Sequence, residues 1–136
     1  MGKKKQTPEP EIPEHVVTAF QETQKKLEVL QTQLDKLHYR IFQENRKKVT
    51  AKLALQFIES PEGANPQNKY YMQVGKAFAM RPFERVKQEL KTTTDDVEKE
   101  LPRLLIAQAQ FDIKKKEQLD NLQAISHTAR HATGKK

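Results

Sequence analysis

The sequence predicts a mainly helical fold in which two long helices pair as an antiparallel coiled coil and one β-hairpin joins them. Three observations carry this prediction. Apolar residues recur every seven positions in both halves of the chain, and a glycine turn lies between two short strand-like runs in the middle. The charged content of 32% also favours a narrow apolar seam over a thick core. With 136 residues, the chain is expected to form one domain.

The first helix is expected over residues 14–48. In a heptad repeat, the residues that face a partner helix occupy two positions, a and d. The a positions are Phe20, Leu27, Leu34 and Ile41, and the d positions are Val16, Thr23, Leu30, Leu37 and Glu44. Pro13 and Glu14 suit a first turn, because that turn has unpaired amide hydrogens and a positive dipole end. After Ile41 the apolar series gives way to a polar and basic run, where we expect the helix to bend or end.

Residues 49–69 are expected to connect the first helix to the hairpin. Thr50 is a good N-cap for a short helix with Leu53 and Phe57 on one face. The alternation of Leu53, Leu55 and Phe57 fits a strand equally well, so the sequence leaves both structures open. The rest of the connector is rich in serine, glycine, asparagine and proline, which is typical of a loop.

Residues 70–81 are expected to form the hairpin, which is the candidate surface for assembly with other chains. Gly75 and Lys76 fit a two-residue turn of type II′, which places Val74 opposite Ala77. One face then carries Tyr70, Met72, Val74, Ala77 and Ala79, and the other carries Tyr71, Gln73, Phe78 and Met80. An isolated two-stranded hairpin is marginal in water, and its open edges pair readily with other strands. We therefore expect strands from partner subunits to complete the sheet.

The second helix is expected over residues 82–125. Its a series has one polar member and consists of Phe83, Leu90, Val97, Leu104, Phe111, Gln118 and Ile125. Pro102 lacks an amide hydrogen and clashes with the carbonyl of Glu98, at a cost of about 3 kcal/mol, so a straight helix is not expected there. A poor helix-forming run of threonines precedes it, and a break within residues 92–102 fits the sequence as well as a bend does.

The chain carries a formal net charge of +7. Residues 1–13 are rich in proline, lysine and glutamate, and residues 126–136 are basic; neither segment has the apolar surface that ordering requires, so we expect disordered tails. The middle of the chain mixes both signs, which is typical of the solvated flanks of a coiled coil. The sequence shows no apolar signal segment and no membrane-spanning run, and a cytoplasmic location without a membrane partner is expected.

The residue types do not indicate a catalytic or cofactor site. The four glycines form no phosphate-binding loop, the chain has no cysteine, and a narrow coiled coil offers no deep pocket. His127 and His131 lie four residues apart, with His15 at the same end of the predicted coiled coil. A metal site needs a third ordered ligand, which a tail containing Gly134 is not expected to supply. We therefore expect a non-enzyme without metal or cofactor.

The order of elements and one short motif resemble a known family. The motif is Tyr-x-x-Val-Gly-x-x-Phe, formed here by Tyr71, Val74, Gly75 and Phe78. A long helix, a connector, this hairpin and a second long helix are similar to the β-type subunits of prefoldin over residues 15–125. An α-type subunit would carry a second hairpin, which the sequence lacks. The 61–66 loop and Pro102 depart from the family pattern.

The resemblance implies a subunit of a hetero-hexameric co-chaperone that works without ATP, together with other α- and β-type subunits. In this family the hairpins form a β-barrel platform. The free ends of the coiled coils hold unfolded chains such as actin and tubulin and deliver them to the cytosolic chaperonin. The corresponding ends of this sequence carry the candidate client contacts Val16, Val17, Phe20, Leu119, Leu122 and Ile125.

Two other classes of function remain open from the sequence. The candidate client contacts serve equally well as coiled-coil core, in which case the chain is a structural tether or adaptor that uses its hairpin for assembly alone. A pI of about 9.6, with basic runs at 46–48 and 114–116, also admits a helical protein that binds nucleic acid. Mixed charge favours exposed helix faces over a surface for polyanions, so we do not expect nucleic acid as a partner.

Overall fold

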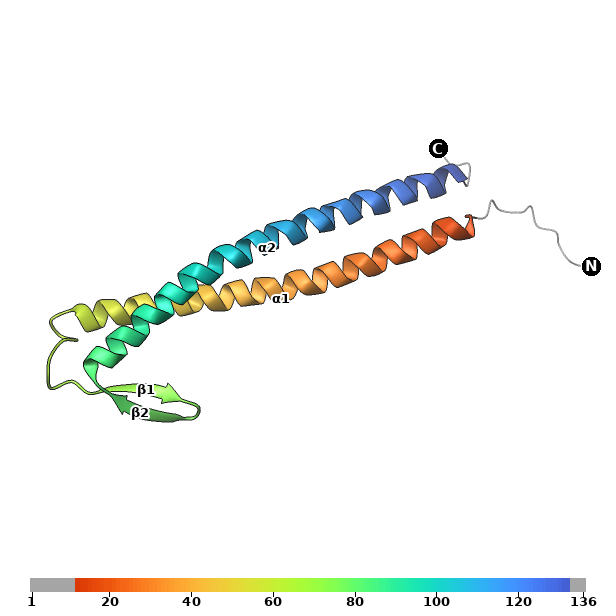
Figure 1. The fold of residues 1–136 in the computed structure, drawn as a ribbon. Coiled ribbons are helices and arrows are strands. Elements are labelled where there is room, and N and C mark those ends of the chain that lie inside the picture. Colours follow the sequence, from red (N-terminus) through yellow and green to blue (C-terminus); the bar gives the residue numbers. More distant parts are fainter. Residues whose placement is uncertain (1–11, 133–136) are drawn as a thin grey trace, which may run out of the picture. The chain divides into compact units, whose positions relative to one another are not determined.

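The computed structural model describes residues 12–132, which form two helices and two strands (Figure 1). The order is α1 (Glu14–Glu59), β1 (Tyr70–Val74), β2 (Ala77–Arg81) and α2 (Phe83–Ala132). The predicted class, mainly helical with one hairpin between two long helices, is therefore confirmed. The predicted disorder of residues 1–11 and 133–136 lies outside the described residues, and completion of the sheet by partner chains stays a prediction.

The chain divides into two compact units. The terminal unit consists of Met1–Lys36 with Gln108–Lys136, and the central unit consists of Leu37–Ala107. Polar contacts join the two helices within each unit. In the terminal unit the Lys115 ammonium donates to Gln31 Oε1 over 2.7 Å. In the central unit the Arg40 guanidinium donates to the Glu100 carboxylate over 2.7 Å.

α1 begins at Glu14 as predicted but continues to Glu59, so the predicted end of the helix at Lys48 is wrong. The helix continues because the heptad register persists. The next a and d positions are filled by Lys48, Ala51, Leu55 and Ile58. Ala51 and Ile58 are each only 3% exposed. This continuation was not predicted, because Glu44 and Lys48 are charged and occupy seam positions. Both are half-buried in the structure, where the aliphatic part of each side chain can line the seam.

The connector therefore spans residues 60–69, and the short helix or strand expected after Thr50 is part of α1. Gly63 closes the turn that follows α1. Its amide donates to Ser60 Oγ over 3.2 Å, and the residue is buried. A Cβ on Gly63 would lie 1.9 Å from the Phe57 carbonyl oxygen, so this close approach requires glycine.

β1 and β2 pair in the register that the glycine turn predicts. The opposed pairs are Tyr70 and Arg81, Tyr71 and Met80, Met72 and Ala79, Gln73 and Phe78, and Val74 and Ala77. Gly75 has a φ of 63°, and no residue other than glycine has a positive φ in the described part of the chain. This combination at Gly75 and Lys76 is that of a type II′ turn. The predicted bounds of the hairpin, 70–81, are confirmed.

α2 runs through Pro102 without interruption, so the predicted possibility of a break within 92–102 is wrong. The neighbouring residues Leu101 and Leu104 are buried and hold this turn against the seam. Pro102 and Glu98 are both exposed, so water can replace the amide that the proline removes from the Glu98 carbonyl. The proline is tolerated because the missing hydrogen bond lies on the solvated side of the helix.

α2 also extends past the predicted end at residue 125, so the prediction of a disordered tail is wrong over residues 126–132. The seam pattern continues there, because Leu122, Ile125 and Ala129 follow one another at spacings of three and four and are all half-buried. Basic residues in the last turn also suit the negative end of the helix dipole.

The two units bury different numbers of side chains. Among the described residues, the central unit buries Ala51, Ile58, Val86, Val97, Leu101 and Leu104, and the terminal unit buries Val16, Thr23 and Leu34. Full burial of an aliphatic side chain contributes about 1.5–3 kcal/mol, so the central unit has the stronger apolar seam. Neither described helix is of the length and apolar character needed to cross a membrane.

Candidate binding surfaces

The hairpin is anchored to its own chain through Tyr70. The Tyr70 hydroxyl donates to the Gly63 carbonyl, and the Tyr70 ring lies 5.9 Å from the Phe83 ring at the start of α2. Met72 and Ala79, on the same face of the hairpin as Tyr70, are half-buried. Two of the predicted assembly residues on this face, Tyr70 and Met72, are therefore at least partly covered within the chain itself, apart from any partner.

The opposite face of the hairpin is open to solvent. Tyr71, Phe78 and Met80 are 57%, 70% and 59% exposed, and we call these three residues the outer hairpin face. The cross-strand neighbours Tyr71 and Met80 are directly opposed in the register. Three large apolar side chains on one face of a sheet are costly to leave in water, which is typical of an interaction surface.

The edges of the hairpin are also open within the described chain. The sheet contains β1 and β2 alone, so each strand has one edge whose backbone amides and carbonyls have no strand neighbour among residues 12–132. Such edges accept added strands, in which backbone hydrogen bonds give affinity and alternate side chains give specificity. The predicted assembly residue Val74 is 54% exposed at the end of β1, beside the turn.

Gly75 contributes through its backbone conformation. A Cβ added there would meet nothing within 4 Å, but its φ of 63° lies in the region that disfavours other residues. The Gln73 side-chain amide donates to the Gly75 carbonyl over 3.1 Å and braces the turn. The sequence identified Gly75 correctly as the turn residue.

The six candidate client contacts all lie in the terminal unit, and we call them the tip. Val16 is only 6% exposed, which places it in the coiled-coil seam. It lines a notch of about 230 Å³ that also contains Ile125, on α2. Phe20, Leu122 and Ile125 are half-buried. Four of the six side chains are thus wholly or partly occupied by packing within the chain.

Val17 and Leu119 are the tip residues that reach solvent. They are 40% and 46% exposed, respectively. Val17 follows the d position Val16 and takes position e at the margin of the seam, whereas Leu119 follows the a position Gln118 and takes position b on the outer side of α2. These two side chains are the ones that a bound chain can contact without opening the coiled coil.

Gln118 lies in the terminal unit, where it is the polar member of the a series of α2. Its Oε1 atom is buried and has no hydrogen-bond partner in the described structure. A buried unsatisfied polar atom costs about 1–3 kcal/mol. This residue therefore weakens the same seam that already buries few side chains.

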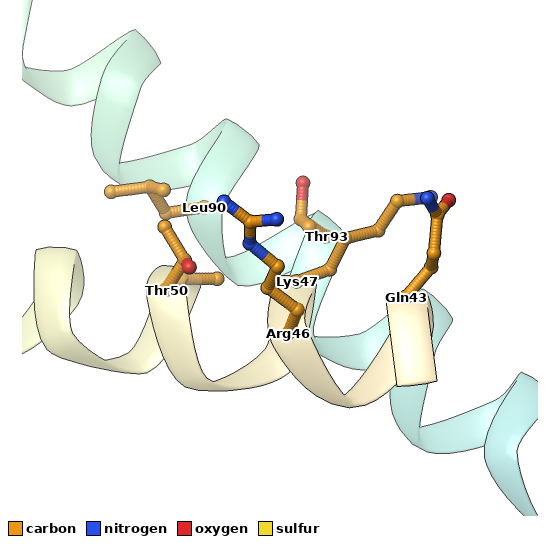
Figure 2. A pocket seen from close by; sticks show the side chains of 7 residues that line it. Gln43, Arg46, Lys47, Thr50, Leu90 and Thr93 are labelled. Atoms are coloured by element: carbon orange, nitrogen blue, oxygen red, sulfur yellow. The ribbon is translucent and has the colours of Figure 1, made fainter. Parts of the chain in front are cut away.

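A groove of about 380 Å³ lies between α1 and α2 in the central unit (Figure 2). It is lined by Gln43, Arg46, Lys47, Thr50 and Ala51 from α1 and by Leu90 and Thr93 from α2. Figure 2 shows the Arg46 and Lys47 side chains along its opening. The lining contains two hydroxyls, two cations and no carboxylate. Lys47 is paired with Glu44 beside the groove, so Arg46 is the cation that suits the groove to an anionic group.

The histidine pair at the end of α2 is more ordered than the sequence predicts. His127 and His131 lie on α2, with their Nε2 atoms 3.0 Å apart and their rings edge to face. Among the described residues no group of three or more metal-ligating side chains comes together. His15, the histidine expected at the same end of the coiled coil, lines the notch beside Val16 on α1. Two imidazoles alone do not complete a structural metal site.

The two basic runs are engaged by neighbours in their own units. In the central unit, Lys47 Nζ lies 3.4 Å from the Glu44 carboxylate, and Lys48 is half-buried. In the terminal unit, Lys115 bonds to Gln31 and Lys114 Nζ lies 5.6 Å from the centre of the Phe111 ring. The cations of each run are therefore spread over different sides of a helix.

Comparison of the sequence with models of known protein families finds no match, and comparison with curated proteins finds none either. The resemblance to β-type prefoldin subunits rests on the helix–hairpin–helix order and the glycine motif.

Proposed function

We propose that the chain is a β-type prefoldin subunit that assembles through its hairpin and holds unfolded polypeptides. The observation that carries the proposal is the outer hairpin face together with the open strand edges. Among β-type subunits the chain is most similar to subunit 1, which pairs the same hairpin pattern with a similarly long second helix.

Assembly on this proposal uses strand addition. Hairpins of neighbouring α- and β-type subunits pair with the free edges of β1 and β2, and the closed barrel covers Tyr71, Phe78 and Met80. Tyr70 keeps the hairpin attached to the connector and to the start of α2 while this happens. The complex then presents several coiled coils at once.

Client capture on this proposal occurs at the tip. Val17 and Leu119 offer exposed apolar contacts, and opening of the weak terminal seam would add Phe20, Leu122 and Ile125. Each contact is weak, but several subunits that engage one chain raise the overall affinity steeply. Neither a cofactor nor catalysis is required, and the held chain is passed to the cytosolic chaperonin.

The assembly step is tested by native mass spectrometry of the tagged chain, purified with its partners from cytosol. We expect a complex of six small subunits of several kinds. Tyr71→Asp with Phe78→Asp should release the tagged chain from this complex, because both charges would be buried in the barrel. Lys76→Ala, a change in the exposed turn of the same hairpin, is the matched control. A tagged chain that purifies alone contradicts the proposal.

The client step is tested by light scattering of denatured actin diluted into the assembled complex. Val17→Ser with Leu119→Ser should reduce suppression of aggregation while the complex keeps its mass. Val29→Ser is the matched control, since Val29 is 56% exposed in the same unit but lies outside the tip. If suppression is unchanged, the tip is not the client surface.

One observation favours a second candidate, a structural tether or adaptor. Val16 is buried in the seam and three further tip residues are half-buried, which is what a purely structural coiled coil requires. A tether would retain the hexamer but fail to suppress aggregation even with the unaltered tip. The actin assay on the unaltered complex therefore separates the two functions.

A further inference from the structure

α1 carries a second apolar surface within the central unit, outside the seam. Its members are Tyr39, Phe42, Val49, Leu53 and Phe57, which are 50–64% exposed. We call these five residues the outer stripe. All lie on one helix and within one unit, so their arrangement depends on helix geometry alone.

The outer stripe faces away from the seam. At 3.6 residues per turn, its five members fall within about 80° of the helix circumference, on the side opposite the seam residues Ala51 and Ile58. Tyr39, Phe42, Val49 and Leu53 occupy heptad positions b and f. Coiled coils normally keep these positions polar because they are farthest from the partner helix.

The same heptad positions are polar in the part of α1 that belongs to the terminal unit. They are filled there by Thr18, Gln21, Lys25, Glu28, Thr32 and Asp35. The pairing of the two helices therefore does not require apolar residues at b and f. An exposed apolar surface of this kind is typical of a binding site. Its spacings of three, seven, four and four residues, with Arg46 between Phe42 and Val49, fit a helical partner.

The charge around the outer stripe is positive. Arg46 lies within the stripe, between Phe42 and Val49, and Lys47 and Lys52 lie on either side of it. Lys52 is paired with the Glu98 carboxylate of α2 over 3.5 Å. Glu44 is the single carboxylate between Asp35 and Glu59 in the sequence. Its side chain is only 13% exposed, on the seam side, where it lies 3.4 Å from Lys47. The partner of this surface should therefore carry negative charge.

A second copy of the chain does not fit this requirement. Two outer stripes packed against each other would bring the Arg46 side chains of both copies close together, and the nearby carboxylates Glu44 and Glu98 are already paired with Lys47 and Lys52. Like charges opposed across an interface disfavour it. Charge complementarity thus points to a different polypeptide.

The groove in Figure 2 adjoins the outer stripe on one side, because Arg46 lines the groove and lies between the stripe residues Phe42 and Val49 on α1. Its lining contains Arg46 and Lys47 and no carboxylate. A helix that lies along the stripe can therefore direct an acidic side chain into the groove while its apolar side chains cover Phe42 and Leu53. Apolar contact and charge pairing would act on the same partner helix.

We propose that the outer stripe of α1 binds an acidic amphipathic helix of another protein, with apolar residues along one face and glutamate or aspartate at its margins. The proposal does not depend on the proposed function, since the stripe shares no residue with the outer hairpin face or the tip. It adds a docking site for a helical partner to a chain whose other candidate surfaces bind strands and unfolded segments.

The test uses two synthetic helices of about three heptads, both with leucine at a and d and one tryptophan. One peptide carries glutamate at e and g, and the other carries lysine. Like charge keeps each peptide from pairing with itself. The protein contains no tryptophan, so peptide emission alone reports burial when the full chain is added. We expect the acidic peptide to shift to the blue and to bind at least about tenfold more tightly than the basic one.

Three variants locate the binding. Phe42→Ser with Leu53→Ser should weaken the acidic peptide by about tenfold or more, because two central anchors are truncated. Arg46→Glu should weaken the acidic peptide and reduce its advantage over the basic one. Val29→Ser, an exposed change on α1 in the terminal unit, should leave binding unchanged. Circular dichroism should show unaltered helix content for all three, because every changed residue is exposed.

Several results would overturn the proposal. Equal binding of both peptides would mean that charge does not select the partner. An unchanged affinity for Phe42→Ser with Leu53→Ser would mean that the peptide binds elsewhere, and its loss in Val17→Ser with Leu119→Ser would assign it to the tip. A lower sedimenting mass for the stripe variant without peptide would show that a second copy of the chain covers the stripe.

Discussion

The terminal and central units contain the same two helices but distribute their apolar residues differently. The terminal unit buries three residues among those described, one of them Thr23, and its outer b and f positions on α1 are polar. The described part of the central unit buries six side chains and also exposes the outer stripe. The central unit therefore has more buried apolar side chains and an apolar outer side of α1, whereas the terminal unit has fewer buried side chains and polar b and f positions on α1.

This difference indicates a division of roles along the helices. A weakly packed end can open at a small cost in free energy and then lend its seam residues to a bound chain. A strongly packed segment can support a hairpin and an external docking surface without losing its own structure. Substitutions in the central unit and in the terminal unit test this contrast.

Burying a charge in the central seam should have the largest effect on stability. Val97 is only 2% exposed, so Val97→Asp should lower the free energy of unfolding by about 4 kcal/mol or more. Thermal and urea unfolding followed by circular dichroism measure this loss. Ile106→Asp, at an exposed position on the same helix, is the control and should change stability by less than about 0.5 kcal/mol. A mild effect of Val97→Asp would mean that the central seam is not the stable part.

Truncating the terminal seam should have a smaller and local effect. Leu34 is 2% exposed, and Leu34→Ala should cost about 2–4 kcal/mol. Amide hydrogen exchange should become faster within residues 14–36 and 108–132 and stay slow around the buried residues of the central unit. Val29→Ala serves as the exposed control. Faster exchange in both units alike would show that they unfold together.

Adding one methyl group to Gly63 in the connector and to Gly75 in the hairpin turn should distinguish two structural roles of glycine. Gly63→Ala should cost about 2 kcal/mol, because the new Cβ would overlap the Phe57 carbonyl at the end of α1. Gly75→Ala has space for its Cβ and should cost only about 1 kcal/mol, through its positive φ. Urea unfolding of both variants checks the order, and a larger loss for Gly75→Ala would contradict it.

Repairing the polar defect of the terminal unit should give a small gain. Gln118→Leu removes the buried Oε1 atom that has no partner and should raise the free energy of unfolding by about 1 kcal/mol. Gln110→Leu, at an exposed position of α2, is the matched control and should give no gain. On the proposed function, the repaired variant should also hold denatured actin less well, since its tip opens less readily.

Much of the fold was predictable because heptads and turns are local patterns. The a and d series of α1, the type II′ turn at Gly75 and the strand register all follow from residues close together in the sequence. The predictions failed where local chemistry was outweighed by packing. Lys48 and Pro102 looked like ends of helices, but buried neighbours such as Ala51 and Leu101 carry the seam past both.

The candidate surfaces were predictable as sets of residues but not in their exposure. The sequence identified the hairpin and the tip, yet it could not tell that Tyr70 is held within the chain while Tyr71 faces solvent. It likewise grouped Val16 with Val17, although one is buried and the other exposed. The outer stripe was not predicted, because the predicted seam depends on heptad positions a and d alone. The apolar residues at positions b and f of α1 are the signal in the sequence that indicates it.

The sequence by itself determined the helix–hairpin–helix order, the heptad register and the conformation of the glycine turn, since each depends on backbone preferences and side-chain spacing over a few residues. Only the tertiary structure decided which apolar side chains are covered and how far each helix extends. Both depend on the residue that packs across the seam, and that residue lies far away in the chain.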